Sequence, residues 1–504
     1  MEHTFVALPP DYDDVFLYDS ANKPFRQVLW GDWIWIDDTK PDTDPKFRHV
    51  LWAPNDPAKR QQLKIKREHT TDARPLEIIF VDVGQGDGAV LITPERDTRE
   101  RIIVVDAGEG PEMGEFLDQR FGAYRKGFKF HAAVITHPDE DHYFGFKAIF
   151  DSGKIKFDTV YHSGLVERRT GEGFDRLGGL TRDDALRTSF LEDLVETDAR
   201  MRQLFSGPTN DRKYAGVIKS ALDNQAVGNF AMLSTAHGKL EDSKSWMPGF
   251  APSDGRPYQI EVLGPFVETG PTGKNRLRKI DDYGKTKNGH SVILKLCFKD
   301  FRVLFGGDLN LPAEKFLLMK YAGLDRWPSD PADRDAMLVQ VRPRFRSEVL
   351  KVCHHGSADV TDEFLEVVDP AAFVISSGDQ EGHVHPRPDL LGRLGQKGRG
   401  RSPVLLSTEL QRSTRAREDQ RLVTQLTSDI AAQIVRQTTA REQRIGEAIK
   451  SLSRSNVDVD GAIYLKTDGE RLITAFKKES RSDTKKWFYF EYRIADGNLL
   501  LVPR

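Results

Sequence analysis

Cysteine, long apolar runs and an excess of one charge are all scarce or missing in this sequence of 504 residues. Its two cysteines, Cys297 and Cys353, cannot form a disulfide framework and predict a reducing, cytoplasmic environment. No apolar run approaches the ~20 residues of a membrane-spanning helix, and the N-terminal residues lack the basic and apolar stretches of a secretory signal. The formal charge of −3 gives no general attraction to nucleic acid, so such binding would need a local patch.

The remaining composition is that of a globular protein. Hydrophobic residues make up 38% of the chain and the mean hydropathy is −0.52, which is typical of a soluble protein with a sizeable core. The length predicts two or three domains. Histidine is the informative residue type, because six of the 13 histidines fall in three tight clusters.

Residues 1–74 are predicted to form a small β module. The stretches QVLWGDWIWIDD and RHVLW alternate apolar and polar residues, with turns rich in Pro and Asp between them. A half-open, SH3-like barrel would satisfy this pattern. The tryptophans could form a binding platform, but tryptophan at alternating strand positions more often belongs to a core.

Residues 75–410 are predicted to form one α/β domain. LEIIFVDVG, AVLITP, RIIVVDAG and AAVITH contain short β-branched runs, which are typical of buried strands. Further strands are expected in HSVILKLCF, RVLFGGD, VLKVCHH and AAFVISSG. Residues 165–254 are charged and favour helix, and we interpret them as an insertion that caps the strands.

Residues 411–504 are predicted to form a helical segment followed by a β-hairpin. Apolar residues recur at i, i+4 spacing between residues 411 and 453, which gives one stripe on a charged helix. This stripe could bind a protein partner, as could the tryptophan-rich module, although packing against the chain's own domain is the commoner outcome. Asp468-Gly469 marks the turn of the hairpin.

The strongest chemical signal is THPDEDHYFG, which follows a β-branched strand and precedes an expected helix. It concentrates four ligand-type side chains in six positions: His137, Asp139, Asp141 and His142. A tight loop at a strand end can bring such short side chains to one point. Imidazole and carboxylate together suit Zn²⁺, Mn²⁺ or Fe²⁺, and a larger carboxylate share favours Mn²⁺.

Ligand-type residues also follow three later strands. FGGDLN places Asp308 at a strand end, KVCHHGS places His354 and His355 at the next, and GHVHPRP places His383 and His385 after the third. Each residue alone has an ordinary explanation, such as a helix cap for Asp308 or a loop position for His383. Because strand ends meet at one edge of an α/β sheet, their recurrence predicts a shared metal site.

The motifs DVGQGDG, VVDAG, THPDEDHYFG, NGHSVIL, FGGD, HHGS and HP occur in an order that resembles metallo-β-lactamase-fold hydrolases. More narrowly, the series is similar to the soluble metallo-β-lactamase domain of ComEC-type DNA-uptake proteins, over residues 76–408. The resemblance implies a four-layer αβ/βα sandwich whose two sheets meet over one or two metal ions. Asp139 departs from the superfamily, which most often has His there. The membrane helices of the ComEC-type channel are missing, so the resemblance does not imply a transport function.

The resemblance implies ligands for one or two divalent ions, Zn²⁺ or Mn²⁺. It gives His137 and Asp139 to the first ion, Asp141 and His142 to the second, and Asp308 to both. His290, just before SVILKL, is a further candidate for the first ion, or simply a residue that precedes a strand. His385 is the candidate for the last ligand of the second ion.

Supporting roles complete what the resemblance implies. His354 or His355 contacts the scissile group as a catalytic residue, and the sequence does not choose between them. Asp141 orients the attacking water as well as binding metal. Three further carboxylates hold imidazole N–H groups or the loop beside them: Asp82, Asp87 and Asp106.

The expected chemistry is hydrolysis, because water on such ions ionises near neutral pH and attacks a phosphorus or carbonyl centre. We expect a metal-dependent phosphodiesterase or nuclease acting on DNA, RNA or a nucleotide. A basic stretch before NGHS could hold phosphates or be a solvated loop: Lys274, Arg276, Arg278 and Lys279. The alternatives are a hydrolase of esters, thioesters or lactams, and a scaffold or regulatory partner with a structural metal site.

Overall fold

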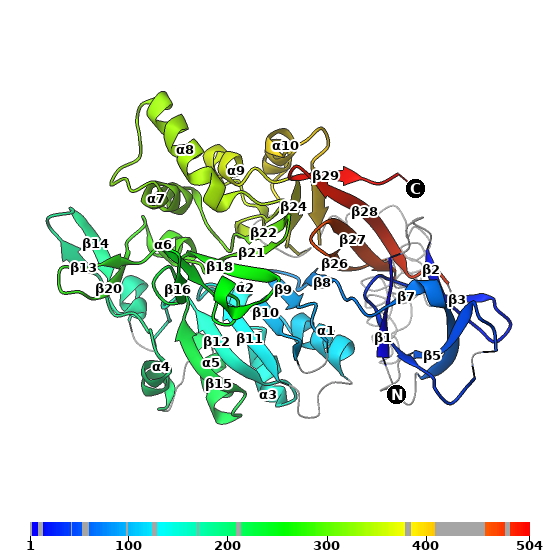
Figure 1. Ribbon diagram of the computed structural model, residues 1–504. Coiled ribbons are helices and arrows are strands. Elements are labelled where there is room, and N and C mark those ends of the chain that lie inside the picture. The colour runs from blue at the N-terminus through cyan, green and yellow to red at the C-terminus, as the bar shows by residue number, and fades with distance from the viewer. Residues whose placement is uncertain are drawn as a thin grey trace, which may run out of the picture.

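Two large β-sheets form the centre of the computed structural model, and helices lie on their outer sides (Figure 1). The structure describes residues 3–8, 14–41, 43–52, 60–96, 99–122, 129–168, 171–207, 213–378, 385–408, 459–478 and 484–503. The helix predicted within residues 411–453 lies outside these described residues, as does His383.

The first large sheet has ten strands and includes the C-terminal part of the chain. In spatial order they are β15 (Val227–Met232), β12 (Phe157–His162), β11 (Phe130–Ile135), β10 (Ile102–Ala107), β9 (Gly88–Ile92), β8 (Leu76–Phe80), β26 (Val459–Thr467), β27 (Arg471–Lys478), β28 (Trp487–Ala495) and β29 (Asn498–Leu501). The four strands from β15 to β10 are parallel, and the other neighbours are antiparallel.

The second large sheet has eight strands. In spatial order they are β16 (Lys239–Glu241), β17 (Lys244–Trp246), β18 (Tyr258–Gly264), β21 (Ile293–Phe298), β22 (Phe301–Phe305), β23 (Val349–Lys351), β24 (Ala372–Ile375) and β25 (Val404–Ser407). The last four strands are parallel, so the loops that follow β22, β23 and β24 leave from the same edge.

Apolar cores lie between the two sheets and on the outer side of each. The first sheet packs on α1 (Glu112–Phe121), α3 (Phe146–Ser152), α4 (Asp198–Phe205) and α5 (Tyr214–Asp223). The second packs on α7 (Leu311–Tyr321), α8 (Pro331–Phe345), α9 (Asp362–Val368) and α10 (Pro388–Lys397). None of the helices in the described ranges has the length and apolar character needed to traverse a lipid bilayer.

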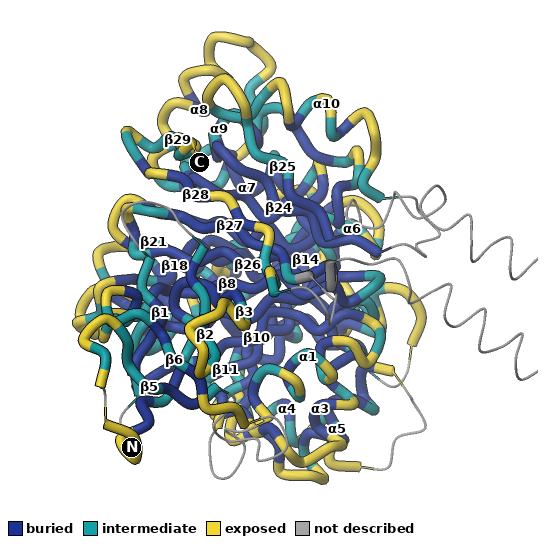
Figure 2. Tube along the Cα trace, turned by 90° about the vertical axis from the view of Figure 1, so that its right-hand side faces the viewer, coloured by how far each residue is buried: buried dark blue, intermediate teal, exposed yellow. Residues whose placement is uncertain are grey.

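Residues of β8 show why the sequences of the central strands are continuous apolar runs. Ile78 and Phe80 face the core between the sheets, whereas Ile79 faces the core beneath the helices. Successive side chains of a strand point to opposite faces, and here both faces are covered. The strand is therefore buried along its full length, as Figure 2 shows for the central strands.

The segment 165–254 differs from the predicted cap. β15 and the pair β16–β17 complete the edges of the two large sheets, and α4 and α5 pack on the first sheet. β13 (Thr181–Asp183) and β14 (Thr188–Leu191) instead join β20 (Asn275–Arg278) and β19 (Glu268–Thr269) in a separate four-stranded sheet. The charged sequence reflects amphipathic helices whose apolar side, such as Met201 and Phe205 of α4, faces inward.

The N-terminal residues form a sheet of their own, in the strand order β3 (Pro24–Val28), β2 (Val15–Tyr18), β6 (Gln61–Lys66), β5 (Phe47–Trp52), β4 (Trp33–Ile36), β1 (His3–Val6) and β7 (Thr70–Thr71). This sheet has a separate apolar core. It also contacts the C-terminal strands, because the Gln27 side chain accepts hydrogen bonds from the backbone N–H groups of Lys486 and Trp487, each at 2.8 Å. β26 in turn pairs with β8, so the C-terminal hairpin is part of the first large sheet.

Glu314 in α7 gives a test of the packing beneath the second sheet. Its side chain is fully buried, and burial raises its pKa to about 8, although Thr361 donates two hydrogen bonds to it. A folded-state pKa above the unfolded value means that the native state holds an extra proton at intermediate pH, so this group's contribution to stability falls as pH rises from about 4.5 to about 8.

We expect the free energy of unfolding of Glu314→Gln, measured by urea denaturation, to fall less between pH 6 and pH 9 than that of the wild type. The difference should be on the order of 2–3 kcal/mol, because Gln is neutral at every pH. The exposed Glu115 on α1 supplies the control, and Glu115→Gln should follow the wild type. Parallel pH profiles for Glu314→Gln and wild type would contradict the raised pKa of Glu314.

Candidate metal centre

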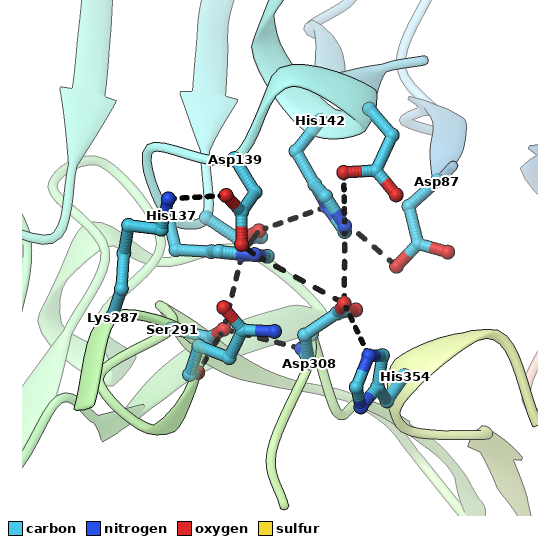
Figure 3. Close-up of polar contacts among 12 residues, drawn as sticks. Asp87, His137, Asp139, His142, Lys287, Ser291, Asp308 and His354 are labelled. Carbon is cyan, nitrogen blue, oxygen red and sulfur yellow. Dashed lines mark hydrogen bonds and ion pairs between the residues drawn. The ribbon is translucent and has the colours of Figure 1, made fainter. Parts of the chain in front are cut away.

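The loops that follow β10, β11, β22 and β23 meet at one edge of the two sheets (Figure 3). His137 follows β11, and His142 lies in the short helix α2 (Glu140–Tyr143) after it. Asp308 follows β22 and His355 follows β23. All four of these side chains are buried, and their polar atoms converge.

Three imidazoles present their Nε2 atoms to this point of convergence. The Nε2 atoms of His142 and His355 are 3.3 Å apart, and each lies 3.3 Å from Asp308 Oδ2. The Nε2 of His137 lies 4.0 Å from the same oxygen. Asp141 approaches from the other side, with Oδ2 3.3 Å from His355 Nε2. The shared carboxylate of Asp308 thus joins all three histidines.

The opposite ring nitrogens of His142 and His355 are fixed as donors. His142 Nδ1 lies 2.8 Å from Asp106 Oδ2, and that carboxylate also accepts two hydrogen bonds from Thr136, at 2.8 and 2.7 Å. His355 Nδ1 lies 3.2 Å from the carbonyl of Ser376 and 3.1 Å from Asp87 Oδ1. A carboxylate and a backbone carbonyl both accept, so Nδ1 is the donor in each ring and Nε2 is left for the centre.

His137 is oriented in the same way by hydroxyl groups. Ser291 Oγ donates its single proton to the carbonyl of Asn288 at 2.7 Å and accepts from the backbone N–H of Asp308 at 3.1 Å. Its contact with His137 Nδ1, at 3.2 Å, is therefore one in which the ring donates. Thr136 Oγ1, whose proton goes to Asp106, accepts from the same Nδ1 at 3.1 Å. His137 therefore also turns an Nε2 lone pair inward.

The charges at this point favour a bound cation. Burial opposes protonation of His142 and His355, but Asp308 and its neighbouring carboxylates raise the pKa of both rings well above the ordinary value. Burial raises the pKa of Asp308, yet His355 and His142 lower it well below its usual range. Protons on the rings or a metal ion can supply the positive charge that these carboxylates require.

The residues present fit a divalent metal ion. His137 Nε2 and Asp308 Oδ1 are buried and have no hydrogen-bond partner among the described residues. Asp87, His142, Asp308 and His355 offer donor atoms that all lie within 4.8 Å of one another. Within this group Asp87 contacts Nδ1 of His355 rather than the inward Nε2, so we assign it to orienting that ring. Mixed imidazole and carboxylate donors suit Zn²⁺ or Mn²⁺.

Asp139 lies in a different setting from the other ligand-type carboxylates. Its Oδ2 is 3.5 Å from His137 Nε2, while its Oδ1 forms an ion pair with the ammonium of Lys287. Lys287 belongs to α6 (Tyr283–Gly289) and is buried. Asp139 therefore shares its charge between the centre and a lysine.

The structure separates the later histidines from one another. His355 lies inside the cluster, whereas His354 is half-exposed, with Nε2 3.9 Å from Asp308 Oδ2. The ring of His385 lies 5.9 Å from the ring of His354. His290 does not fit the predicted ligand role: its Nε2 donates to the carbonyl of Arg278 at 2.7 Å, so that nitrogen has no lone pair for a metal. Burial lowers the pKa of His290 to about 4.

Two of the four predicted phosphate-binding side chains are engaged elsewhere. Arg276 is buried, with an ion pair to Asp183 at 2.8 Å. Arg278 pairs with Glu268 through two hydrogen bonds, at 2.8 and 2.7 Å. These contacts correct the prediction for both arginines, because their guanidinium groups stabilise the small four-stranded sheet. Lys274 and Lys279 are exposed.

The loops beside the centre require unusual backbone geometry. Gly86 has φ +107°, and a Cβ there would lie 1.8 Å from the carbonyl oxygen of Asp141, so the GQGD loop can approach α2 only with glycine. Asp106, His354 and His355 also have positive φ, between 49° and 55°. Non-glycine residues in this region cost about 1–3 kcal/mol each and are typical of functional sites. Asp82 accepts from Gly84 N at 3.3 Å and lies against Gly461 of β26, at the base of the same loop.

Sequence reasoning missed four side chains at the centre: Thr136, Ser291, Lys287 and Lys351. Ser291 lies inside the NGHS motif, beside the histidine that was considered instead. Lys351 is buried and forms an ion pair with Asp87. Its signal was a lone charge within the apolar strand VLKV. Lys287 had no distinct signal, because it belongs to a stretch rich in lysine and arginine.

One family model matches part of the chain. Residues 89–214 match the family model described as the metallo-beta-lactamase superfamily. This range contains His137, Asp139, Asp141 and His142, and the geometry adds Asp308 and His355 from beyond it. No curated protein matches the chain. The family match and the buried Asp/His cluster together support a metal-dependent hydrolase.

The hydrogen bond from His142 to Asp106 can be tested by Asp106→Asn. Asn is isosteric and tolerates positive φ, but it cannot hold the Nδ1 proton as a carboxylate does. We expect the affinity for Mn²⁺ or Zn²⁺, measured by competition with a chelating dye, to fall about 10–100-fold. Asp158, whose side chain is 56% exposed, supplies the control Asp158→Asn, which should bind like wild type. Equal affinities for all three proteins would contradict the orienting role.

The raised pKa values of His142 and His355 predict that metal binding displaces protons. The carboxylates around these rings raise the pKa of each, so a proton held at Nε2 must leave before that ring can bind a metal. We expect release of about one to two protons for each ion bound, and an affinity that rises from pH 6 to pH 8. Titration calorimetry in two buffers of different ionisation enthalpy measures this release. Heats that do not depend on the buffer would contradict the prediction.

Proposed function

We propose that this chain is a metal-dependent phosphodiesterase or nuclease. The observation that carries the proposal is the convergence of three Nε2 atoms, all in the tautomer that leaves a lone pair, on the carboxylates of Asp308 and Asp141. If these histidines served only to stabilise the fold, their Nε2 atoms would not need to face carboxylates with no hydrogen-bond donor between them. The superfamily match at residues 89–214 agrees with hydrolytic chemistry.

The phosphodiester class is proposed from the motif series. The order of DVGQGDG, THPDEDHYFG, FGGD, HHGS and HP resembles the soluble domain of ComEC-type proteins, which act in DNA uptake. We also propose that the two sheets and their helical covers correspond to the four-layer αβ/βα sandwich of that superfamily. The intersheet core and the two outer cores are consistent with this arrangement.

Bound Zn²⁺ or Mn²⁺ would supply a Lewis acid that activates water near neutral pH. Asp141 is suited to bind the ion and to orient the attacking water. Burial raises the pKa of Asp141, but His142 and His355 lower it by more, so the group remains a carboxylate. His354 is the half-exposed ring beside Asp308 and could donate a proton or a hydrogen bond to the leaving group. His142 and His355 would hold the ion, oriented by Asp106 and Asp87, and His137, oriented by Ser291, offers a further ligand atom beside them.

The function can be tested with Asp308→Asn. The protein is loaded with Mn²⁺ or Zn²⁺ and offered bis(p-nitrophenyl) phosphate, linear DNA, single-stranded RNA, a β-lactam and a thioester. We expect phosphodiester cleavage by the wild type, and its loss to the background rate in the variant, because Asp308 contacts all three histidines. The matched control is Asp300→Asn at the exposed turn before β22, which should retain wild-type activity.

Two results would contradict the proposal. Cleavage of the β-lactam or the thioester without cleavage of any phosphodiester would assign the site to acyl chemistry. Metal binding without cleavage of any of these substrates, by either protein, would favour a scaffold with a structural metal site.

A further inference from the structure

Lys287 is a buried cation at the edge of the candidate metal centre. Its ammonium forms ion pairs with Asp139 Oδ1 and with Glu167 Oε1, the latter at 3.1 Å. Figure 3 shows Lys287 pointing toward Asp139, on the side of His137 away from His142. Lysine is rarely buried unless it is paired, so these two carboxylates account for its position.

The position of Lys287 is fixed by a second set of contacts. Glu167 is buried and accepts a hydrogen bond from Tyr283 at 2.7 Å. Its other oxygen pairs with Arg176 at 2.6 Å. The hydroxyl and the guanidinium thus hold Glu167, and Glu167 holds Lys287 against Asp139. This network leaves the ammonium in place whether or not Asp139 binds a metal.

Lys287 makes the two halves of the centre unequal. The first half contains His137, Asp139 and a share of Asp308, and its own carboxylate is paired with an ammonium. The second half contains Asp141, His142, His355 and the rest of Asp308. Among the described residues, neither Asp141 nor Asp308 forms an ion pair with a lysine or an arginine. These two carboxylates together match the charge of one divalent ion.

We propose that the centre binds one divalent ion tightly, between Asp141, His142, Asp308 and His355, and that Lys287 takes the place of a second cation beside Asp139. The ammonium neutralises the negative charge of Asp139, which a metal ion in the first half would otherwise neutralise. A second ion would lie close to a fixed positive charge and share a carboxylate already in use. This inference rests on the proposed metal-dependent function, but it concerns binding and is tested without a substrate.

The test is the number of ions bound by the full chain. Native mass spectrometry and titration calorimetry with Mn²⁺ and with Zn²⁺ should show one tight equivalent for the wild type, with any second equivalent at least about tenfold weaker. Lys287→Met removes the ammonium and keeps much of the apolar stem. We expect this variant to bind a second equivalent at least about tenfold more tightly than the wild type does.

Lys285 provides the matched control. It lies two residues earlier in α6, its side chain is 41% exposed, and it pairs with Asp281. Lys285→Met should retain the wild-type stoichiometry. Lys287→Arg, which keeps the charge, should also bind one tight equivalent. Two tight equivalents in the wild type, or an unchanged single equivalent in folded Lys287→Met, would overturn the proposal.

Asp139→Asn keeps the proposal testable if Lys287→Met does not fold. This substitution removes the carboxylate of the first half and leaves Asp141, His142, Asp308 and His355 intact. We expect it to keep the tight equivalent, whereas a tight site in the first half would be lost. A protein that binds one ion tightly but cleaves no phosphodiester would contradict the proposed function and leave this inference standing.

Discussion

Carboxylates gathered at one buried sheet edge are the constraint on which the rest of the site depends. Asp87, Asp106 and Asp308 are each almost fully buried within one cluster. A buried charge without a partner is strongly unfavourable, and removing one partner of a buried pair costs about 3–5 kcal/mol. Each carboxylate must therefore be matched by an imidazole, an ammonium, a hydroxyl or a metal ion. The arrangement of donors around the centre follows from that requirement.

The sheets make this gathering possible because they bring strand ends together from distant parts of the sequence. The parallel order of β22 and β23 delivers Asp308 and His355 to the same edge, and β11 of the facing sheet delivers His137. The core between the sheets fixes their separation through contacts such as Phe80 with Phe305, whose ring centroids are 5.9 Å apart. Packing thus sets the relative positions of the candidate ligands.

The sequence predicted those parts of the site that depend on local pattern. Strands with apolar residues on both faces are recognisable as continuous runs, and the ligand-type residues at their ends were found with them, as at Asp308. The sequence could not show which of His354 and His355 points into the cluster, because the direction of each side chain depends on the left-handed backbone at both positions. The pairing of β26 with β8 joins segments far apart in the chain, so no local sequence pattern predicts it. Lys287 was missed for the same reason, since its partners Asp139 and Glu167 come from other elements.

The two buried lysines explain why carboxylates of the same chemical type have different roles. Lys351 pairs with Asp87, whose other oxygen then lies beside Nδ1 of His355. Asp87 is thereby an orienting group, although its oxygens lie within ligand distance of the cluster. Lys287 does the same to Asp139 from the opposite side. A carboxylate paired with a fixed ammonium has less charge to offer a metal, so the lysines determine which carboxylates remain for it. The identity of the ligands is therefore set by the cations around them as much as by the loop that carries them.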